Sequence, residues 1–263
     1  AEPAQAAQAA TAQSAAAAPL AGKRVLVSAG GTREAIDPVR YIGNRSSGKQ
    51  GVALARAAAR LGATVELIAA NVEADVAGTS EQQENLQLTR VTSTADLQQV
   101  MNSAAEHADV IIMAAAVADF RPRAVADTKI RKAELTADAP VIELVRNPDI
   151  LMGLVEQRRP HQVVVGFAAE TARDDEHLLQ LGREKLRRKG VDLLVVNPVG
   201  WTEGFEADHN SIVVLDQTEN VRLRTSGTKD EIASAVLETI SSVLNSSVLD
   251  SSALDSSALD EEQ

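Results

Sequence analysis

The stretch Ser28-Ala-Gly-Gly-Thr-Arg-Glu-Ala-Ile-Asp-Pro-Val-Arg-Tyr-Ile-Gly-Asn-Arg-Ser-Ser-Gly-Lys49 decides how this chain folds. An apolar strand beginning at Arg24 precedes it, and a helical pattern follows it over residues 50–61. Glycines let a phosphate approach the backbone, and the free N–H groups of a helix start point at it. Gly30-Gly31 and Ser46-Ser47-Gly48 both suit such an anion. We therefore expect a nucleotide or another phosphorylated ligand.

Two familiar phosphate motifs nearly fit this stretch, and both fail. A P-loop needs Ser or Thr after its lysine to bind Mg²⁺, but Gln50 follows Lys49 here. The dinucleotide fingerprint needs a third glycine that does not follow Gly30-Gly31. The strand predicted at 64–69 also ends without the acidic residue that holds a ribose 2′-hydroxyl. Neither motif identifies the ligand.

The composition bounds the class of protein. A chain of 263 residues makes one large domain or two small ones, and 44% hydrophobic residues can fill a core. The chain has no Cys, which excludes thiolate chemistry and suits a reducing cytoplasm, where we expect the protein. No apolar run approaches the roughly 20 residues of a membrane span. A net charge of −11 gives no general attraction to nucleic acid, so we expect neither a membrane nor a nucleic-acid partner.

The two ends differ in composition from the body. Residues 1–22 are rich in Ala and Gln and are predicted to be a disordered linker of the kind that joins a domain to a longer chain. Residues 246–263 repeat Ser-Ser-Val/Ala-Leu-Asp and form an acidic low-complexity tail, for which we also expect no order. The folded domain is therefore predicted over residues 23–245.

The body alternates strand and helix patterns. Predicted strands cover 24–28, 64–69, 86–91, 109–115, 163–168, 191–196 and 211–215; predicted helices cover 48–61, 94–106, 148–157, 173–189 and 228–244. Several strands are almost entirely apolar, as in a parallel sheet covered on both faces. The pattern predicts an α/β fold with a Rossmann-like, doubly wound, mostly parallel sheet. Extended pieces at 129–135 and 141–145 interrupt the alternation, so we expect a β excursion over 129–145.

Ligands of such sheets bind beyond the carboxyl ends of the strands. This rule gathers Gly30-Gly31, residues 114–119, residues 167–170 and Asn197. The small side chains of residues 114–118 allow a flat ring to lie on the backbone. Asp119 is either a ligand of a metal or sugar hydroxyl, or a solvated turn residue.

Other residues have a functional and a structural interpretation. Lys129-Ile-Arg-Lys132 is a cation cluster or a charged edge strand. Asn147 is predicted to cap a helix with Pro148 in its first turn, and Phe167 belongs to the core or stacks on a base. Lys185 and Lys189 share a helix face, which is either a solvated end or a polyphosphate clamp. The four His residues suggest no metal pair and no catalytic triad.

Six blocks together resemble the phosphopantothenoylcysteine synthetase family, the carboxylate–amine ligases of coenzyme A biosynthesis. They are T-R-E-x-x-D-P-V-R-Y-I-x-N-x-S-S-G-K-x-G at 32–51, A-A-V-A-D-F-R at 115–121, K-I-x-K at 129–132, N-P-D-I at 147–150, V-G-F-A-A-E-T at 165–171 and G-F-x-x-D-x-N at 204–210. The resemblance spans about residues 23–245. One departure is Pro198, where the family more often has Asp after the Asn. In bacteria this domain is typically the C-terminal half of a bifunctional protein, behind a decarboxylase, so FMN is expected only in that other half.

The resemblance implies an activity. The bacterial type uses CTP and Mg²⁺ to activate the carboxylate of 4′-phosphopantothenate as an acyl-cytidylate, which the amine of L-cysteine then attacks. It also implies a homodimer, in which the excursion at 129–145 pairs with or reaches toward a partner. No protein nucleophile is required, which agrees with the absence of Cys and of a triad.

The site residues follow from the motifs and the resemblance. We expect nucleotide contacts from Gly30, Ala114, Ala115, Asp119, Lys129, Pro148, Asp149, Ile150, Leu151, Phe167, Lys185 and Lys189. Substrate contacts are expected from Arg40, Asn44, Ser46, Ser47 and Gly48, with the phosphate at the helix start. Asn44 and Lys129 are the expected catalytic residues, and Asp119 is the expected metal ligand.

Two alternatives stay open at this point. A non-catalytic regulatory domain would bind the nucleotide without releasing pyrophosphate. A short-chain-type reductase would need a Tyr-x-x-x-Lys motif, but Tyr41 is followed by Arg45 at the lysine position.

Overall fold

The computed structural model describes residues 18–78, 84–131, 139–200 and 209–259. Its centre is a sheet with the strand order β12-β11-β10-β9-β6-β1-β4-β5. The parallel strands are β1 (Arg24–Gly30), β4 (Thr64–Ala70), β5 (Leu86–Val91), β6 (Val110–Met113), β9 (Val163–Glu170) and β10 (Leu193–Pro198). The strands β11 (His209–Asp216) and β12 (Val221–Thr228) continue the sheet antiparallel. The predicted α/β class and mostly parallel sheet are confirmed, and β12 is an addition to the predicted strands.

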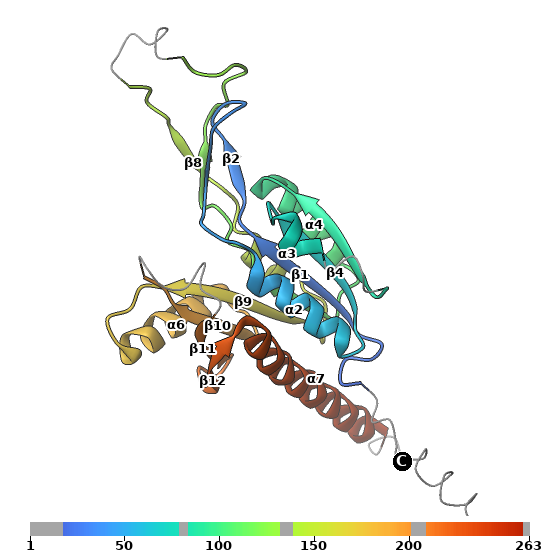
Figure 1. Cartoon of the computed structure of the whole chain (residues 1–263). Coiled ribbons are helices and arrows are strands. Elements are labelled where there is room, and N and C mark those ends of the chain that lie inside the picture. The colour runs from blue at the N-terminus through green and yellow to red at the C-terminus, as the bar shows by residue number, and fades with distance from the viewer. Residues whose placement is uncertain (1–17, 79–83, 132–138, 201–208, 260–263) are drawn as a thin grey trace, which may run out of the picture.

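Helices cover both faces of this sheet (Figure 1). The helices α2 (Lys49–Arg60) and α7 (Lys229–Leu259) lie on one face; α4 (Thr94–Ala105), α5 (Ile150–Glu156) and α6 (Asp175–Lys189) lie on the other. Val25 and Val27 of β1 pack in the first layer, whereas Leu26 packs in the second. The strands are apolar at successive positions because both of their faces are buried.

The sheet has a switch point between β1 and β6. After β1 the chain passes through α2 to β4 on one side, and after β5 it returns through α4 to β6 on the other side. Immediately beyond the strands, Gly31 and Ala116 form a parallel bridge, and the Ala116 N–H donates to the Gly30 carbonyl at 2.8 Å. Such a switch point opens a crevice at the carboxyl ends of the strands.

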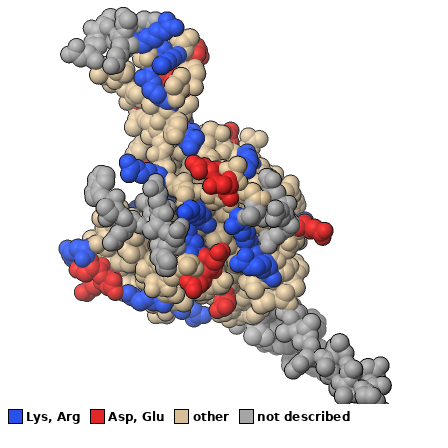
Figure 2. Space-filling model, viewed as in Figure 1, with Lys and Arg blue, Asp and Glu red and all other residues tan. Residues whose placement is uncertain are grey.

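An arm projects from this end of the sheet (Figure 1). It contains two short antiparallel pairs, β2 (Arg33–Ala35) with β3 (Tyr41–Gly43) and β7 (Phe120–Pro122) with β8 (Leu144–Arg146). The Ala126 N–H donates to the Ile36 carbonyl at 3.0 Å and joins the two excursions. Figure 2 shows Lys and Arg side chains gathered toward the far end of the arm.

The predicted extended pieces of this excursion are partly wrong. Residues 129–131 have no regular structure, and residues 132–138 lie outside the described part. The Ile130 backbone bonds to side chains instead of to a strand, since its N–H donates to Asp37 Oδ2 at 3.1 Å and its carbonyl accepts from Arg40 Nη2 at 2.9 Å. The second extended piece, predicted over 141–145, is shorter than predicted and begins further along the chain, because β8 starts at Leu144.

The two ends of the chain also differ from the prediction. The linker predicted through residue 22 ends sooner, because Leu20 is fully buried and its N–H donates to the Leu61 carbonyl at 3.0 Å; residues 1–17 lie outside the described part. Helix α7 continues to Leu259, through most of the tail for which no order was predicted. Extending a formed helix is far easier than starting one, and the tail repeat contains no Pro or Gly to stop it. No helix of the described residues has the length and apolar character needed to cross a membrane.

Candidate active site

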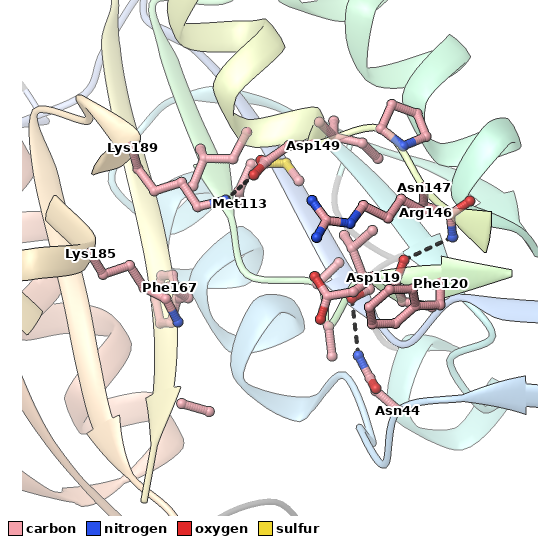
Figure 3. Close-up of a pocket in the computed structure, with 18 of the residues that line it drawn as sticks. Asn44, Met113, Asp119, Phe120, Arg146, Asn147, Asp149, Phe167, Lys185 and Lys189 are labelled. Carbon is pink, nitrogen blue, oxygen red and sulfur yellow. Dashed lines mark hydrogen bonds and ion pairs between the residues drawn. The ribbon is translucent and has the colours of Figure 1, made fainter. Parts of the chain in front are cut away.

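A cavity of about 790 Å³ lies at the carboxyl edge of the sheet, where the arm joins the body. We call it the main pocket (Figure 3). Its walls are the loop after β6, residues 146–151, Phe167 of β9 and the last turns of α6. The cavity therefore occupies the place that the switch point predicts for a ligand.

Buried hydroxyl groups hold the floor of the main pocket. Ser28 and Thr32 are fully buried, and their Oγ atoms accept from the Ala115 N–H at 3.2 Å and the Ala118 N–H at 2.9 Å. These bonds fix the backbone of residues 115–118. The alanine side chains of this loop leave open space above it.

Asn147 supports the floor instead of capping a helix. Its Nδ2 donates to the Ala118 carbonyl at 2.8 Å and to Thr94 Oγ1 at 3.2 Å. The N-cap of α5 is Asp149, whose carboxylate accepts from the Met152 N–H at 3.2 Å. The predicted cap at Asn147 is wrong because its amide is engaged by the floor loop.

Lys185 and Lys189 bring positive charge to one wall. Both line the main pocket, so the helix face that they share looks into the crevice. Lys185 Nζ lies 2.5 Å from Glu170 Oε1, and Lys189 pairs with Asp149 (Figure 3). Both lysines are therefore held by carboxylates at the edge of the cavity.

Asn44 and Asp119 lie on the wall opposite the two lysines, near Phe120 and Arg146 (Figure 3). Asn44 Nδ2 donates to the Val117 carbonyl at 3.0 Å, which positions the amide beside the floor loop. Asp119 is exposed to the cavity. The main pocket thus presents an amide and a carboxylate on one side and two ammonium groups on the other.

A second, smaller pocket of about 130 Å³ adjoins the main pocket. It contains residues 46–51 at the start of α2, and it shares Ala115, Ala116, Phe167 and Ala169 with the main pocket. Gly48 is the N-cap of α2, with a φ of 77° and no side-chain cap. A Cβ at Gly48 would lie 2.6 Å from Val72 Cγ2, so glycine is required there. An uncapped helix start that lines a cavity is suited to an anion.

Most predicted site residues line the two pockets. The main pocket contains Asn44, Ala115, Asp119, Pro148, Asp149, Ile150, Leu151, Phe167, Lys185 and Lys189. The second pocket contains Ser46, Ser47, Gly48 and Ala114, together with the shared Ala115 and Phe167.

Gly30 lies behind the pockets and lines neither of them. Its φ is +87°, and an added Cβ would lie 2.0 Å from the Ala70 carbonyl oxygen. Gly30 and Gly48 also pass close to one another, because a Cβ added at Gly48 would lie 3.1 Å from the Gly30 N atom. The role of Gly30 in the structure is therefore the close passage of β1 beside the start of α2.

Arg40 and Lys129 lie on the arm and line neither pocket. Arg40 pairs with the buried carboxylate of Asp37, with Arg40 Nε at 2.9 Å from Oδ2. This guanidinium and the backbone amides of Val39, Ile130 and Arg40 hold the pKa of Asp37 well below its usual range. Lys129 is exposed next to this cluster of Asp37, Arg40 and Ile130, which we call the Asp37 knot.

Several lining residues were not among the predicted site residues. The main pocket adds Arg45, Arg146 and Arg188, and the second pocket adds Gln50, Asn210 and Lys229. Arg45 and Gln50 flank the glycine motif and Arg188 lies within the basic run of α6, so a signal existed for these three. Lys229 follows β12, a strand that was not predicted from the sequence. It lies far along the chain from the glycine motif, so no local pattern linked the two.

No cluster of three metal-ligating side chains is found among the described residues. Asp119 and Asp149 both line the main pocket. Mg²⁺ that accompanies nucleotide phosphates usually takes only one or two protein carboxylates. The residues present therefore fit a magnesium ion brought in with a nucleotide.

A doubly wound sheet with an uncapped helix start at its switch point and a cationic crevice beside it defines the class as an α/β protein whose crevice is suited to a phosphorylated ligand. Comparison with known proteins gives the family. Residues 20–244 match the family described as the DNA/pantothenate metabolism flavoprotein C-terminal domain, and the chain belongs to this family.

Relatives and solved structures agree with this assignment. The chain is 47% identical over 234 residues to the coenzyme A biosynthesis bifunctional protein CoaBC of Mycobacterium tuberculosis H37Rv. The aligned region covers 86% of this chain and 53% of that protein. It is 40% identical to the protein of the same name from Bacillus subtilis, with 86% and 53% covered. The crystal structure of a CoaBC C-terminal domain matches with a TM-score of 0.68 at 33% identity, covering 87% of this chain and 99% of that one. The chain thus spans about half the length of these curated relatives and nearly all of the solved domain.

Proposed function

We propose that this chain is a phosphopantothenate–cysteine ligase that activates its acid with CTP in coenzyme A biosynthesis. The observation that carries the proposal is the pair of adjoining pockets, which share a wall of small residues and Phe167. One pocket suits a phosphate and the other suits a nucleotide triphosphate. The relatives at 40–47% identity are named as proteins of coenzyme A biosynthesis, which supports the proposed pathway.

In the first proposed step, the phosphate of 4′-phosphopantothenate binds at the start of α2. Its carboxylate reaches across Ala115 and Ala116 into the main pocket. A carboxylate oxygen attacks the α-phosphorus of CTP, a carboxyl–phosphate bond forms, and the bond to pyrophosphate breaks. Lys185 and Lys189 exchange their carboxylate partners for the triphosphate and stabilise the negative charge that leaves with pyrophosphate.

In the second proposed step, the amine of cysteine attacks the acyl carbon. The carbon–nitrogen bond forms, the amine loses a proton, and CMP leaves with the electrons of the broken acyl–oxygen bond. The Asn44 amide is suited to donate to the acyl oxygen while its own oxygen accepts from the amine. The reaction then depends on positioning and charge neutralisation rather than on a protein nucleophile.

Asp119 and Asp149 would hold the Mg²⁺ that accompanies CTP, and the ion would neutralise phosphate charge when bound. FMN stays a prediction for a separate decarboxylase half of a longer protein. The cytoplasmic location also stays a prediction.

The arm supports a homodimer as part of the proposal. Exposed large apolar side chains gather on it, whereas monomers rarely leave such groups unburied together. They are Val39, Tyr41, Phe120, Val125, Val141 and Leu144. A second copy packed on this surface would cover them and would bring Arg40 and Lys129 toward a pocket.

The proposal is tested by supplying the chain with CTP, Mg²⁺, 4′-phosphopantothenate and L-cysteine. Mass spectrometry should show 4′-phosphopantothenoylcysteine and CMP in equal amounts. The alternative, a regulatory domain, predicts that CTP raises the melting temperature while no product forms. That outcome would overturn the ligase.

A further inference from the structure

Two buried threonines pair behind the floor of the main pocket. Thr32 lies two residues beyond the end of β1, and Thr94 is the first residue of α4. Both are fully buried, and Thr94 Oγ1 donates to Thr32 Oγ1 at 3.1 Å. Neither residue lines the main pocket or the second pocket, so any effect of the pair on a ligand there passes through other residues.

The neighbours of Thr94 fix the direction of this pair. The Thr94 N–H donates at 2.8 Å to Oε1 of Glu34, which is itself buried. The Thr94 Oγ1 accepts from Asn147 Nδ2 at 3.2 Å, so the hydroxyl hydrogen of Thr94 is directed to Thr32. A buried hydroxyl pair of this kind is stable only while each group has its partner.

Thr32 holds the floor loop at two points. Its N–H donates to the Ala116 carbonyl at 3.2 Å, and its Oγ1 accepts from the Ala118 N–H at 2.9 Å. The Ala118 N–H belongs to the same planar peptide as the Val117 carbonyl. That carbonyl accepts from Asn44 Nδ2 at 3.0 Å (Figure 3). One rigid peptide therefore joins a buried hydroxyl behind the floor to the Asn44 amide in the cavity.

We propose that Thr32 and Thr94 are positioning residues for Asn44. A hydroxyl that fixes the Ala118 N–H also fixes the direction of the Val117 carbonyl, because the peptide is planar. The carbonyl in turn orients the Asn44 amide toward the reacting groups. This inference rests on the proposed ligase function, in which Asn44 serves the attack of cysteine and not the attack on CTP.

The experiment measures both half-reactions of Thr32→Val, which retains the branched shape of the side chain and loses its hydroxyl. Single-turnover rates are taken on one preparation for pyrophosphate release from CTP and 4′-phosphopantothenate, and for amide formation when cysteine is then added. We expect amide formation to slow about 10- to 100-fold, the cost of a buried N–H without its acceptor, and pyrophosphate release to change less than about threefold. An unfolded fraction lowers both amplitudes and changes neither rate.

Thr94→Val removes the donor to Thr32 and retains the bond from the Ala118 N–H. It should slow amide formation about 3- to 10-fold, the net contribution of one hydrogen bond. Thr32→Ser restores the hydroxyl and should restore amide formation. The matched control is Thr239→Val on α7, whose hydroxyl donates to the Ala235 carbonyl of its own helix at 3.0 Å; both half-reactions should be unchanged in this variant.

A double variant tests whether the effect passes through Asn44. Thr32→Val combined with Asn44→Asp should form the amide no more slowly than Asn44→Asp alone, because the group that Thr32 positions is already lost. Thr32 acting only on the stability of the floor would instead add its full loss to that of Asn44→Asp.

The outcomes separate this inference from the function beneath it. Equal losses in the two half-reactions of Thr32→Val, unchanged amide formation, or additive losses in the double variant would overturn the positioning role and leave the ligase intact. If Thr32→Val does not fold, Thr94→Val goes through the same comparisons. No pyrophosphate from the unaltered chain would overturn the ligase itself.

Discussion

Different residues of the main pocket are expected to serve the two steps of the proposed reaction. Asn44 is bonded to the floor loop and lies across the cavity from the lysines. An amide is suited to the attack of the amine, whereas ammonium groups are suited to the departure of pyrophosphate. Variants at the two places should therefore fail differently.

Asn44→Asp should still release pyrophosphate but should accumulate the acyl-cytidylate. The change preserves the shape of the side chain but removes both amide donors and places negative charge beside the developing oxyanion. Mass spectrometry of the quenched reaction should show the intermediate, and Asn102→Asp on α4, outside both pockets, should behave as the unaltered chain. Equal loss of pyrophosphate release and amide formation would assign Asn44 to the first step.

Lys189→Met should raise the KM for CTP by about 10- to 100-fold through loss of a charged hydrogen bond. The matched control is Arg187→Met on the same helix, because Arg187 pairs with Glu219 at 2.8 Å and does not line the main pocket. Steady-state kinetics at saturating acid measure both. A KM that changes equally in the two variants would mean that only the net charge of α6 matters.

Among the structural elements, the arm is the least expected from the sequence. Strands β2 and β3 have only three residues each, which is too short for an alternating pattern to predict them. Helices α2, α4, α5 and α6 were predicted within two residues at each end, because apolar periodicity and local caps act over short distances, whereas α7 continues past its predicted end at 244 to Leu259. Ser46, Ser47 and Gly48 were found for the same local reason. Lys229 and the knot of Asp37 with Ile130 depend on contacts between distant segments, which no local pattern contains.

Asp37→Asn should loosen the arm. The Asp37 side chain has no exposed surface, and its carboxylate accepts from the amides of Val39 and Arg40 at 2.8 Å and of Ile130 at 3.1 Å. Hydrogen exchange at neutral pH should become faster at these amides. Glu143→Gln is the control on the same arm, because its ion pair with Arg123 is exposed. Unchanged protection in Asp37→Asn would show that the knot does not hold the arm.

The pH dependence of the knot has a definite sign. The Arg40 guanidinium lowers the folded-state pKa of Asp37 below the usual aspartate value of about 3.9. The stability that this carboxylate contributes is therefore complete above that value and is lost as the pH falls below it. Protection of the Ile130 amide should accordingly persist from neutral pH down to about 4.

The proposed dimer decides whether Lys129 takes part in the reaction. Lys129 lines neither the main pocket nor the second pocket of its own chain, so we expect it to act in a pocket of a second copy. Mixed dimers of Asn44→Asp and Lys129→Gln would then contain one site with both changes and one site with neither. Activity should reappear when the two inactive preparations are mixed and allowed to exchange subunits. No recovery after demonstrated exchange would remove Lys129 from the partner's site.

The proposed ligase activates a phosphorylated acid with CTP before any amine is present. The direct measurement is pyrophosphate release from CTP and 4′-phosphopantothenate without cysteine, with ATP in a parallel reaction. We predict a burst of about one pyrophosphate per active site with CTP, an acyl-cytidylate of the expected mass, and little release with ATP. Binding of CTP without pyrophosphate release would contradict the ligase reaction, and equal bursts with both nucleotides would contradict the choice of CTP.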